Sequence, residues 1–579
     1  MRLTGLDWAV MVAFFALNVG LGLAFGRRAK SSLDEFFVSG RDVPWWLAGT
    51  SMVATTFSAD TPLVVTGLVV AHGVPGNWLW WNAVASGILT VFFFASLWRR
   101  AGVMTDVELI ELRYAGKPAA VLRAFRAAYL AIPINCVILG WVNLAMAKIL
   151  GLTLGLPKGP AVAVCLLVTG LYVSVSGLWG VLWADVLQFV VKLGCTIALA
   201  FYAVDAAGGI DGIRAVVPAE RLAMLPPADA AWMPGVSIAV YLGVQWWAAW
   251  YPGAEPGGGG YVAQRIFAAR TERDGVLATL WFNVAHYCVR SWPWILTALA
   301  AYTLYPGLRD GTDRDPEGAY VRVMIDHLPP SLRGLMMAGF IAAYMSTVAT
   351  HLNWGASYLV RDLYARFLKP GESEAHYVRA SRVATVLTML MAGGVTLLLS
   401  SVEGAWKILL SMGAGTGLVL ILRWYWWRIN AWSEIVAMAA SLVASLVLQH
   451  VVGIDPSQPA GFAHLMLGTL AITTVSWVTA TFATSPEPMD KLVSFYTRVR
   501  PAGGGWGPVA AVAGDVGSAG PSMGVRLRDW ALGCALIYLS LFGTGKVLMH
   551  DTGPGVALLA GAALCAALLW RDLRREAIT

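Results

Sequence analysis

The chain has 579 residues, of which 58% are hydrophobic and only 13% are charged. This composition excludes a soluble globular enzyme and is typical of a protein that crosses a membrane many times. The net charge of +7 does not require a nucleic-acid partner, because basic residues also collect in the cytoplasmic loops of membrane proteins.

Apolar segments long enough to cross a bilayer recur along the whole chain. A helix needs about 20 apolar residues to span the hydrocarbon core. We therefore predict an all-α polytopic membrane protein with about 15 transmembrane helices. The predicted spans lie near residues 6–26, 44–71, 78–98, 124–149, 159–176, 181–205, 234–263, 276–305, 333–359, 383–401, 405–423, 432–452, 463–484, 529–547 and 553–570.

The distribution of basic residues predicts the orientation of the bundle. If the N-terminus lies outside, the inner segments hold 28 of the 41 Lys and Arg residues, as the positive-inside rule requires. The prediction is a multi-pass protein of the plasma or inner membrane with a cytoplasmic C-terminus. Arg27 and Arg28 follow the first apolar segment instead of preceding it, so we expect this segment to remain in the mature protein.

Other features of the sequence exclude several kinds of site. All six cysteines fall inside apolar spans without paired spacing, which argues against a disulfide framework and a metal site. Residues 485–527 are rich in Gly and Pro and lie on the basic side, which predicts a flexible cytoplasmic linker. The chain has no GxxxxGKS motif, so ATP is not expected to be its energy source.

Two of the predicted spans are interrupted by residues that break helices. The second carries Asp60 and Pro62 in mid-span, and the seventh carries Pro252, Pro256 and glycines 257–260. Unwound backbone at membrane depth persists where it is buried or lines a cavity, and transporters place such breaks in corresponding helices of inverted repeats. The breaks lie five spans apart, which predicts two five-helix repeats. The alternative is that Gly and Pro only kink packed helices.

A hydroxyl pair lies within the ninth predicted span. Ser346 and Thr347 are adjacent, and the carbonyl of Ala343 lies one turn before them. Oxygen ligands of this kind suit a hard monovalent cation such as sodium. The alternative is a helix-packing patch, in which the hydroxyls bond to backbone carbonyls. A second source of oxygen ligands would favour the ion.

Three segments resemble the sodium/solute symporter family, whose members share the leucine-transporter-like fold. They are FFVSGRDVPWWLAGTSMVATTFSAD (36–60), SGLWGVLWADVLQF (176–189) and AAYMSTVATHLNW (342–354), with AQRIFAAR (263–270) as a weaker fourth. The resemblance covers about residues 30–430. With the breaks, it implies a transport core (44–430) with repeats at about 44–206 and 234–424. The apolar spans outside the core predict a first helix and loop (1–43), two further helices (431–484), the linker (485–527) and two C-terminal helices (528–579).

The resemblance implies where sodium, the predicted cofactor, binds. The ligands carried over by motif are the carbonyls of Ala54, Phe57 and Ala343 and the hydroxyls of Ser346 and Thr347. Some relatives bind a second ion, for which Asp185 and Thr350 match two ligand positions. Ala349 departs from that pattern, because such relatives have serine there. Asp185 is alternatively a structural partner of Lys192.

The solute cavity is expected beside the two breaks, lined by aromatic residues and a few polar groups. The candidates are Asp60, Thr61, Trp78, Trp81, Asn82, Gln245, Trp246, Trp247, Trp250, Tyr251 and Arg290. A charge in mid-span, such as that of Arg290, implies a water-filled cavity or an acidic partner such as Asp60. His286 is predicted to be a hydrogen-bonded core histidine.

These features predict a sodium-coupled symporter that imports a small polar organic solute by alternating access. Tryptophans beside Asn and Gln favour a sugar, whereas Arg290 favours a carboxylate or an amino acid. The expected partners are the solute, sodium and membrane lipid, without nucleic acid or ATP.

Three other classes of protein are alternatives to a transporter. A membrane enzyme would need a motif such as HExxH or GxSxG, which the sequence lacks. A channel would need a filter of repeated carbonyls or charges. A transporter-like sensor without transport stays as the alternative of a different class, although the residues after the last span offer no output domain.

Overall fold

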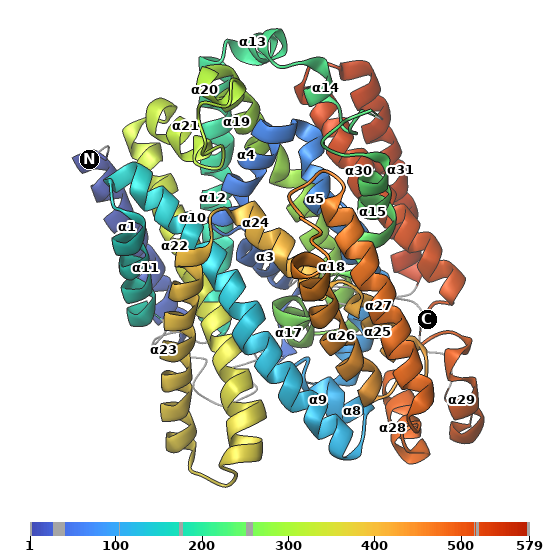
Figure 1. The fold of residues 1–579 in the computed structure, drawn as a ribbon. Coiled ribbons are helices and arrows are strands. Elements are labelled where there is room, and N and C mark those ends of the chain that lie inside the picture. The colour runs from blue at the N-terminus through green and yellow to red at the C-terminus, as the bar shows by residue number, and fades with distance from the viewer. Residues whose placement is uncertain are drawn as a thin grey trace.

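The computed structural model describes residues 3–26, 41–103, 105–172, 178–227, 229–249, 259–514, 516 and 520–575. These residues form a bundle of long helices that contains no β-strand, only an isolated bridge between Val43 and Ala269 (Figure 1). The all-helical fold class predicted from the sequence is confirmed.

The helices follow one another along the chain with short connections. The first part contains α1 (Gly5–Gly26), α3 (Trp45–Thr56), α4 (Asp60–His72), η3 (Val74–Asn77), α5 (Trp78–Trp81), α6 (Ala83–Leu89), η4 (Thr90–Phe94), α7 (Ala95–Ala101), α8 (Glu108–Arg113), α9 (Gly116–Tyr129), η5 (Leu130–Ile134), α10 (Asn135–Leu154), α11 (Lys158–Tyr172), α12 (Leu178–Ala206), α13 (Gly209–Val216) and α14 (Ala219–Leu222). The middle part contains α15 (Gly235–Val240), η6 (Tyr241–Gln245), α16 (Trp246–Ala248), α17 (Gly260–Ala268), α18 (Glu272–Val284), η7 (Ala285–Val289), α19 (Ser291–Leu304), α20 (Pro306–Arg309), α21 (Ala319–His327), α22 (Pro330–Ser357), η8 (Tyr358–Leu368), α23 (Glu374–Leu398), α24 (Val402–Gly413) and α25 (Thr416–Tyr425). The last part contains α26 (Ala431–His450), α27 (Gly461–Ala483), α28 (Met489–Val499), η9 (Gly504–Trp506), α29 (Gly507–Ala513), α30 (Met523–Leu548) and α31 (Thr552–Arg575).

Each of the predicted spans overlaps a helical segment of the structure. By length and composition, nine helices within the described residues are long and apolar enough to cross a membrane, or up to ten if the bent pair α3–α4 is one span. The other predicted spans coincide with helices that are shorter, interrupted or more polar, such as α11, α15 and α24.

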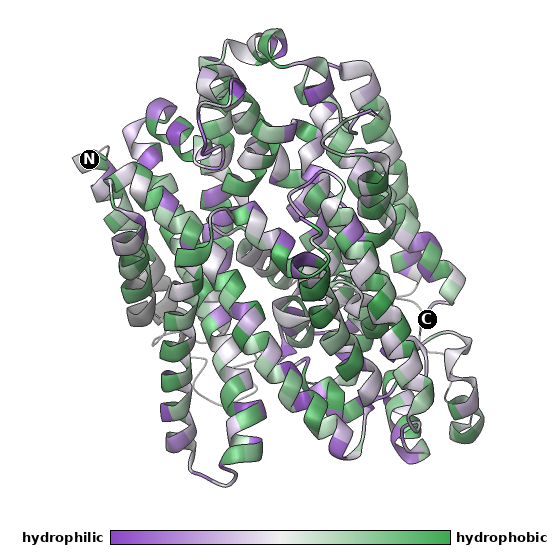
Figure 2. Ribbon diagram, in the orientation of Figure 1, coloured by the Kyte–Doolittle hydropathy of each residue, from purple (hydrophilic) through white to green (hydrophobic). Residues whose placement is uncertain are grey.

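The connecting segments gather at two ends of the bundle. Figure 1 shows α13, α14 and α20 at one end and α8, α28 and α29 at the other. The sequence assigns the first group to the outer side and the second to the inner side, so the two groups separate as the predicted topology requires. In Figure 2, hydrophilic colours are concentrated towards these two ends, and hydrophobic colours predominate along helices such as α30 and α31.

The first predicted break is present between α3 and α4. The two helices meet at an angle of 60°, and Phe57 leaves the helical conformation with φ −90° and ψ 58°. Pro62 has no N–H, and its ring would clash with the carbonyl of Ser58 if the helix ran through. The chain therefore ends one helix at Thr56 and begins another at Asp60.

The second predicted break falls between α16, which ends at Ala248, and α17, which begins at Gly260. Pro252 and Pro256 lie outside the described residues. The end of α16 contacts the segment that connects α24 to α25. The N–H of Gly415 in this segment donates to the carbonyl oxygen of Ala248 at 2.8 Å. Gly415 has a positive φ of 89°, a backbone conformation that glycine adopts without steric cost.

Gly417 tests the packing of this second break. An added Cβ would lie 2.0 Å from the carbonyl oxygen of Trp247, so we expect Gly417→Ala to destabilise the protein by about 1–3 kcal/mol. Gly394→Ala is the control, because a Cβ there meets nothing within 4 Å and alanine favours helix by roughly 0.5–1 kcal/mol. Thermal unfolding of the purified protein, followed by tryptophan fluorescence, measures both. Equal melting temperatures for the two variants would contradict the packing described.

The predicted flexible linker is more ordered than its composition indicates. It contains α28 and α29, and α28 buries Leu492, Phe495 and Val499. These residues lie three, four and seven positions apart, on one face of the helix. The ring centre of Phe495 lies 5.4 Å from the guanidinium carbon of Arg113. This guanidinium donates to the carbonyl oxygens of residues 423, 426, 427 and 429 at 3.0–3.2 Å. The sequence-based prediction rested on the glycines and prolines of the segment and did not recognise this short amphipathic helix.

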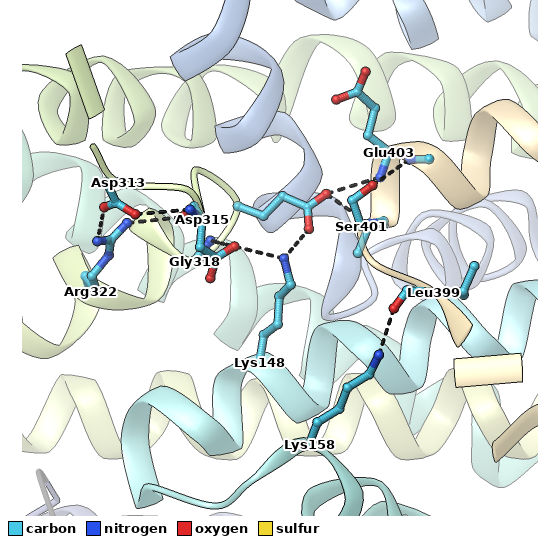
Figure 3. A network of polar contacts seen from close by, with 12 residues as sticks. Lys148, Lys158, Asp313, Asp315, Gly318, Arg322, Leu399, Ser401 and Glu403 are labelled. Carbon is cyan, nitrogen blue, oxygen red and sulfur yellow. Dashed lines mark hydrogen bonds and ion pairs between the residues drawn. The ribbon is translucent and has the colours of Figure 1, made fainter. Parts of the chain in front are cut away.

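An ion cluster joins α10, the segment before α21 and the start of α24 (Figure 3). Lys148 of α10 donates to Asp315 Oδ1 at 2.9 Å and to Glu317 Oε2 at 2.6 Å. The other carboxylate oxygen of Glu317 accepts from the N–H groups of Val402 and Glu403, at the start of α24. Close by, Lys158 donates to the carbonyl oxygen of Leu399 at 2.7 Å.

Candidate functional site

A cavity of about 110 Å³ lies beside the break between α3 and α4. Its walls come from α3, α4, α5, α6, α10, η6, α16, α17, η7, α22 and α24, so segments distant in sequence converge on it. The polar and aromatic residues that line it are Thr55, Thr56, Ser58, Asp60, Thr61, Trp80, Asn82, Trp141, Gln245, Trp246, Tyr261, His286, Tyr287, Arg290, Thr347, His351 and Trp406.

The structure brings together several of the residues predicted to bind the solute. Those that line the cavity are Asp60, Thr61, Asn82, Gln245, Trp246 and Arg290. Trp78 and Trp81 lie outside its lining, and both rings contact Phe542 of α30. Trp247 also lies outside the lining, and its indole N–H donates to the carbonyl oxygen of Gly243. Trp250 and Tyr251 fall outside the described residues.

Sequence reasoning missed other residues of the cavity wall, namely Trp80, Trp141, Tyr261, Tyr287, His351 and Trp406. His286, predicted to be a hydrogen-bonded core histidine, lines the cavity, and one of its ring nitrogens contacts Arg290. The signal in the sequence was the position of this histidine one helical turn before a mid-span arginine, which places the two side chains on the same face. The other residues come from apolar helices, where an aromatic side chain gives no indication of whether it faces a cavity or a neighbouring helix.

Two residues of the cavity wall keep a buried acceptor oxygen. Gln245 donates from Nε2 to the carbonyl oxygen of Leu79 at 3.0 Å, while its Oε1 has no hydrogen-bond partner among the described residues. The Oδ1 atom of Asp60 is likewise buried without a partner in the described part of the chain. A buried acceptor without a donor is costly, so both oxygens suit a ligand that carries hydroxyl donors.

Arg290 is fully buried and its guanidinium is already engaged by the protein. It donates to the carbonyl oxygens of Val53 and His286, each at 3.3 Å. Its central carbon lies 5.5 Å from the ring centre of Phe57 and 5.1 Å from that of Trp294, distances at which a cation is attracted by an aromatic face. The guanidinium therefore fixes the α3 break against η7 as well as contributing to the wall.

The two carbonyls predicted to bind sodium at the break already have a donor. Lys192 of α12 donates from Nζ to the carbonyl oxygen of Phe57 at 2.7 Å and to that of Ala54 at 3.2 Å. The sequence had presented Lys192 only as a partner for Asp185. Both carbonyls lie where α3 ends and regular helical bonding stops; that of Ala54 also accepts from the N–H of Phe57 at 3.1 Å.

The hydroxyl pair of α22 lies against the same break. Thr347 Oγ1 donates to the carbonyl oxygen of Thr55 at 3.5 Å, and Ser346 Oγ donates to Asp185 Oδ1 at 3.4 Å. The other carboxylate oxygen of Asp185 accepts from Ser51 Oγ at 2.6 Å. Ala343 and Thr350 lie one turn before and one turn after this pair on α22. The predicted ligand atoms are all oxygens, which are the ligands that an alkali cation prefers.

A helix bundle with an unwound segment between two helices, and with a cavity beside that break, is typical of a membrane transporter with discontinuous helices. The model of the sodium:solute symporter family matches residues 36–443. The chain belongs to this family.

Individual relatives are similar over most of the chain. A sodium/glucose cotransporter of Vibrio parahaemolyticus is 26% identical over 521 residues, which cover 84% of this chain and 92% of that protein. A sodium/myo-inositol cotransporter 2 of Oryctolagus cuniculus is 25% identical over 422 residues, which cover 67% of this chain and 60% of that protein. The solved structure of a Na⁺-coupled sialic acid symporter in a substrate-bound, outward-open state has the same fold, with a TM-score of 0.67, 17% identity and coverage of 84% of this chain and 99% of that one.

Proposed function

We propose that the protein is a sodium-coupled symporter that imports a sugar, a polyol or a related polar solute across the cell membrane. Membership of the sodium:solute symporter family supports transport driven by an ion gradient. The relatives reported above are named for glucose and myo-inositol, both of which are rich in hydroxyl groups. In this proposal the N-terminus lies outside and the C-terminus in the cytoplasm.

The observation that carries the choice of solute is the pair of buried acceptors in an aromatic wall. Asp60 Oδ1 and Gln245 Oε1 have no partner among the described residues, and each is able to accept from a solute hydroxyl. Trp80, Trp141 and Trp246 line the same cavity, and aromatic faces pack well against the apolar CH face of a sugar ring. A solute with several hydroxyls satisfies both kinds of surface.

A carboxylate solute is less well supported. Recognition of a carboxylate by arginine uses two parallel N–H donors of the guanidinium. In Arg290, donors already bond to the carbonyl oxygens of Val53 and His286.

Coupling follows from the position of the predicted sodium ligands. Ala54 lies in the last turn of α3 and Phe57 directly after it, and Ser346 and Thr347 belong to α22. An ion shared by the two elements stabilises one arrangement of them, and a solute that binds this arrangement gains affinity by the same factor. The entry of one sodium supplies roughly 2.3 kcal/mol per 100 mV and about 1.4 kcal/mol for each tenfold gradient.

A thermal-shift screen of the purified protein tests the proposed solute class. The screen compares sugars, polyols, carboxylates and amino acids, each with sodium and with choline. A ligand that binds the folded state raises the melting temperature, so we expect a sugar or polyol to raise it, and more so in sodium. A response to carboxylates alone would contradict the proposal.

A further inference from the structure

The ammonium of Lys192 occupies the position that the sequence assigned to a sodium ion. Its Nζ bonds to the carbonyl oxygens of Ala54 and Phe57 at 3.2 and 2.7 Å. It also lies 5.0 Å from the ring centre of Phe57, within the range of a cation–π contact. The whole residue is only 6% exposed. A single positive charge thus satisfies two predicted ligands of the ion.

The surrounding helices are shaped to hold this side chain. Gly339 of α22 has no Cβ, and one added there would lie 3.3 Å from Lys192 Cγ, so glycine leaves room for the aliphatic stem. α12 packs against both α3 and α22, the two elements between which sodium was predicted to lie. The lysine therefore enters the predicted ion site from a third helix.

The charges around Lys192 are few and come from particular elements. Asp185 on the same helix attracts the ammonium, and Arg290 at the junction of η7 and α19 repels it. From α22 the neighbouring predicted ligands are the hydroxyls of Ser346 and Thr347. On α1, Asp7 is paired with Arg333. The two carbonyls are thus the hydrogen-bond partners of Nζ in the described part of the chain.

We propose that Lys192 is a tethered cation that competes with sodium for the carbonyls of the α3 break. This inference rests on the proposed function, because it concerns the ion site of that symporter. Two unit charges about 4 Å apart repel strongly enough in a protein-like dielectric to weaken binding by roughly a thousandfold. Sodium and the ammonium therefore do not share the carbonyls, and the ion enters only when the ammonium has moved away.

The tethered charge also has a role when the ion has left. Buried carbonyls without a donor are costly. With the ammonium in place, the carbonyl of Phe57 has a donor, that of Ala54 accepts a second bond besides the one from the Phe57 N–H, and a positive charge remains between α3 and α22. The ion-free protein thereby keeps the break structured while it returns to accept the next ion.

The test compares sodium binding by the wild-type protein with binding by Lys192→Met and Lys192→Gln. Sodium replaces choline at constant ionic strength, and the melting temperature of the purified protein is the readout. Both variants remove the positive charge. The glutamine amide is still able to donate to a carbonyl, so Lys192→Gln provides a folded variant for the test if Lys192→Met does not fold. We expect the half-saturating sodium concentration to fall at least about tenfold in each folded variant.

Lys158→Met is the matched control. Lys158 donates to the carbonyl oxygens of Leu397 and Leu399 at 3.2 and 2.7 Å, the same pattern of bonds as in Lys192 but at the end of α23. Its sodium response should equal that of the wild-type protein.

The outcomes separate this inference from the proposed function. A wild-type protein that responds to sodium, with Lys192 variants that respond no more strongly, overturns the inference and leaves sodium symport intact. A wild-type protein that takes up solute without any response to sodium, while the Lys192→Gln variant acquires one, supports the inference and contradicts sodium coupling in the native chain.

Discussion

Replacing Asp60 with alanine is expected to reduce solute uptake by roughly 5- to 150-fold, because a solute hydroxyl left buried without its acceptor costs about 1–3 kcal/mol. The carboxyl is buried at the start of α4 and lines the cavity. Its Oδ1 has no partner among the described residues, which leaves it available to a solute hydroxyl. Initial rates of labelled-solute uptake into proteoliposomes, over a range of solute concentrations, measure the change.

Asp455→Ala is the control for this experiment. Asp455 is an exposed turn residue whose Oδ1 accepts from the N–H and the hydroxyl of Ser457 at 2.8 and 2.7 Å. Its replacement should leave uptake within about twofold, since exposed substitutions usually change stability by less than 0.5 kcal/mol. If Asp60→Ala transports as well as Asp455→Ala does, the solute does not use this carboxylate.

Replacing both Ser346 and Thr347 with alanine is expected to abolish the effect of sodium on the melting temperature. The two hydroxyls approach Asp185 and the carbonyl oxygen of Thr55, so they line the seam between α22 and the α3 break. Loss of both hydroxyls removes two of the predicted oxygen ligands, and the affinity of a site for an alkali ion depends on the number of such ligands. The measurement is a sodium titration at constant ionic strength with the bound solute present.

Ser357→Ala provides the comparison on the same helix. The hydroxyl of Ser357 donates to the carbonyl oxygen of Trp354 at 2.9 Å, a bond within α22 and away from the break. This variant should keep the sodium response of the wild-type protein. A double variant of Ser346 and Thr347 that responds as strongly as Ser357→Ala would move the cation site elsewhere.

Local sequence signals predicted the parts of the fold that depend on local chemistry. Pro62 removes a backbone donor and obstructs a helix wherever it stands, so the break before Asp60 followed from the sequence alone. The apolar runs likewise predicted helices at the right positions, because a bilayer demands about 20 apolar residues per span. Asp60, Asn82, Gln245 and Arg290 were recognisable as cavity residues because polar groups are costly in such runs.

Features that depend on contacts between distant segments were not predictable in this way. Trp78 and Trp81 turn to α30, whereas Trp80 lines the cavity, and an all-apolar helix carries no amphipathic pattern to distinguish these faces. The bonds from Lys192 to the α3 carbonyls join two helices far apart in sequence. Such a contact follows only from the way α12 packs across the break.

The most direct test of the account is accumulation of a labelled sugar or polyol by proteoliposomes under an imposed sodium gradient. The solute is the one that raises the melting temperature most in the screen. We expect saturable accumulation above the external concentration with an inward sodium gradient, and only slow equilibration when choline or potassium replaces sodium at constant pH. Uptake that is equally fast in all three salts would contradict sodium-driven symport.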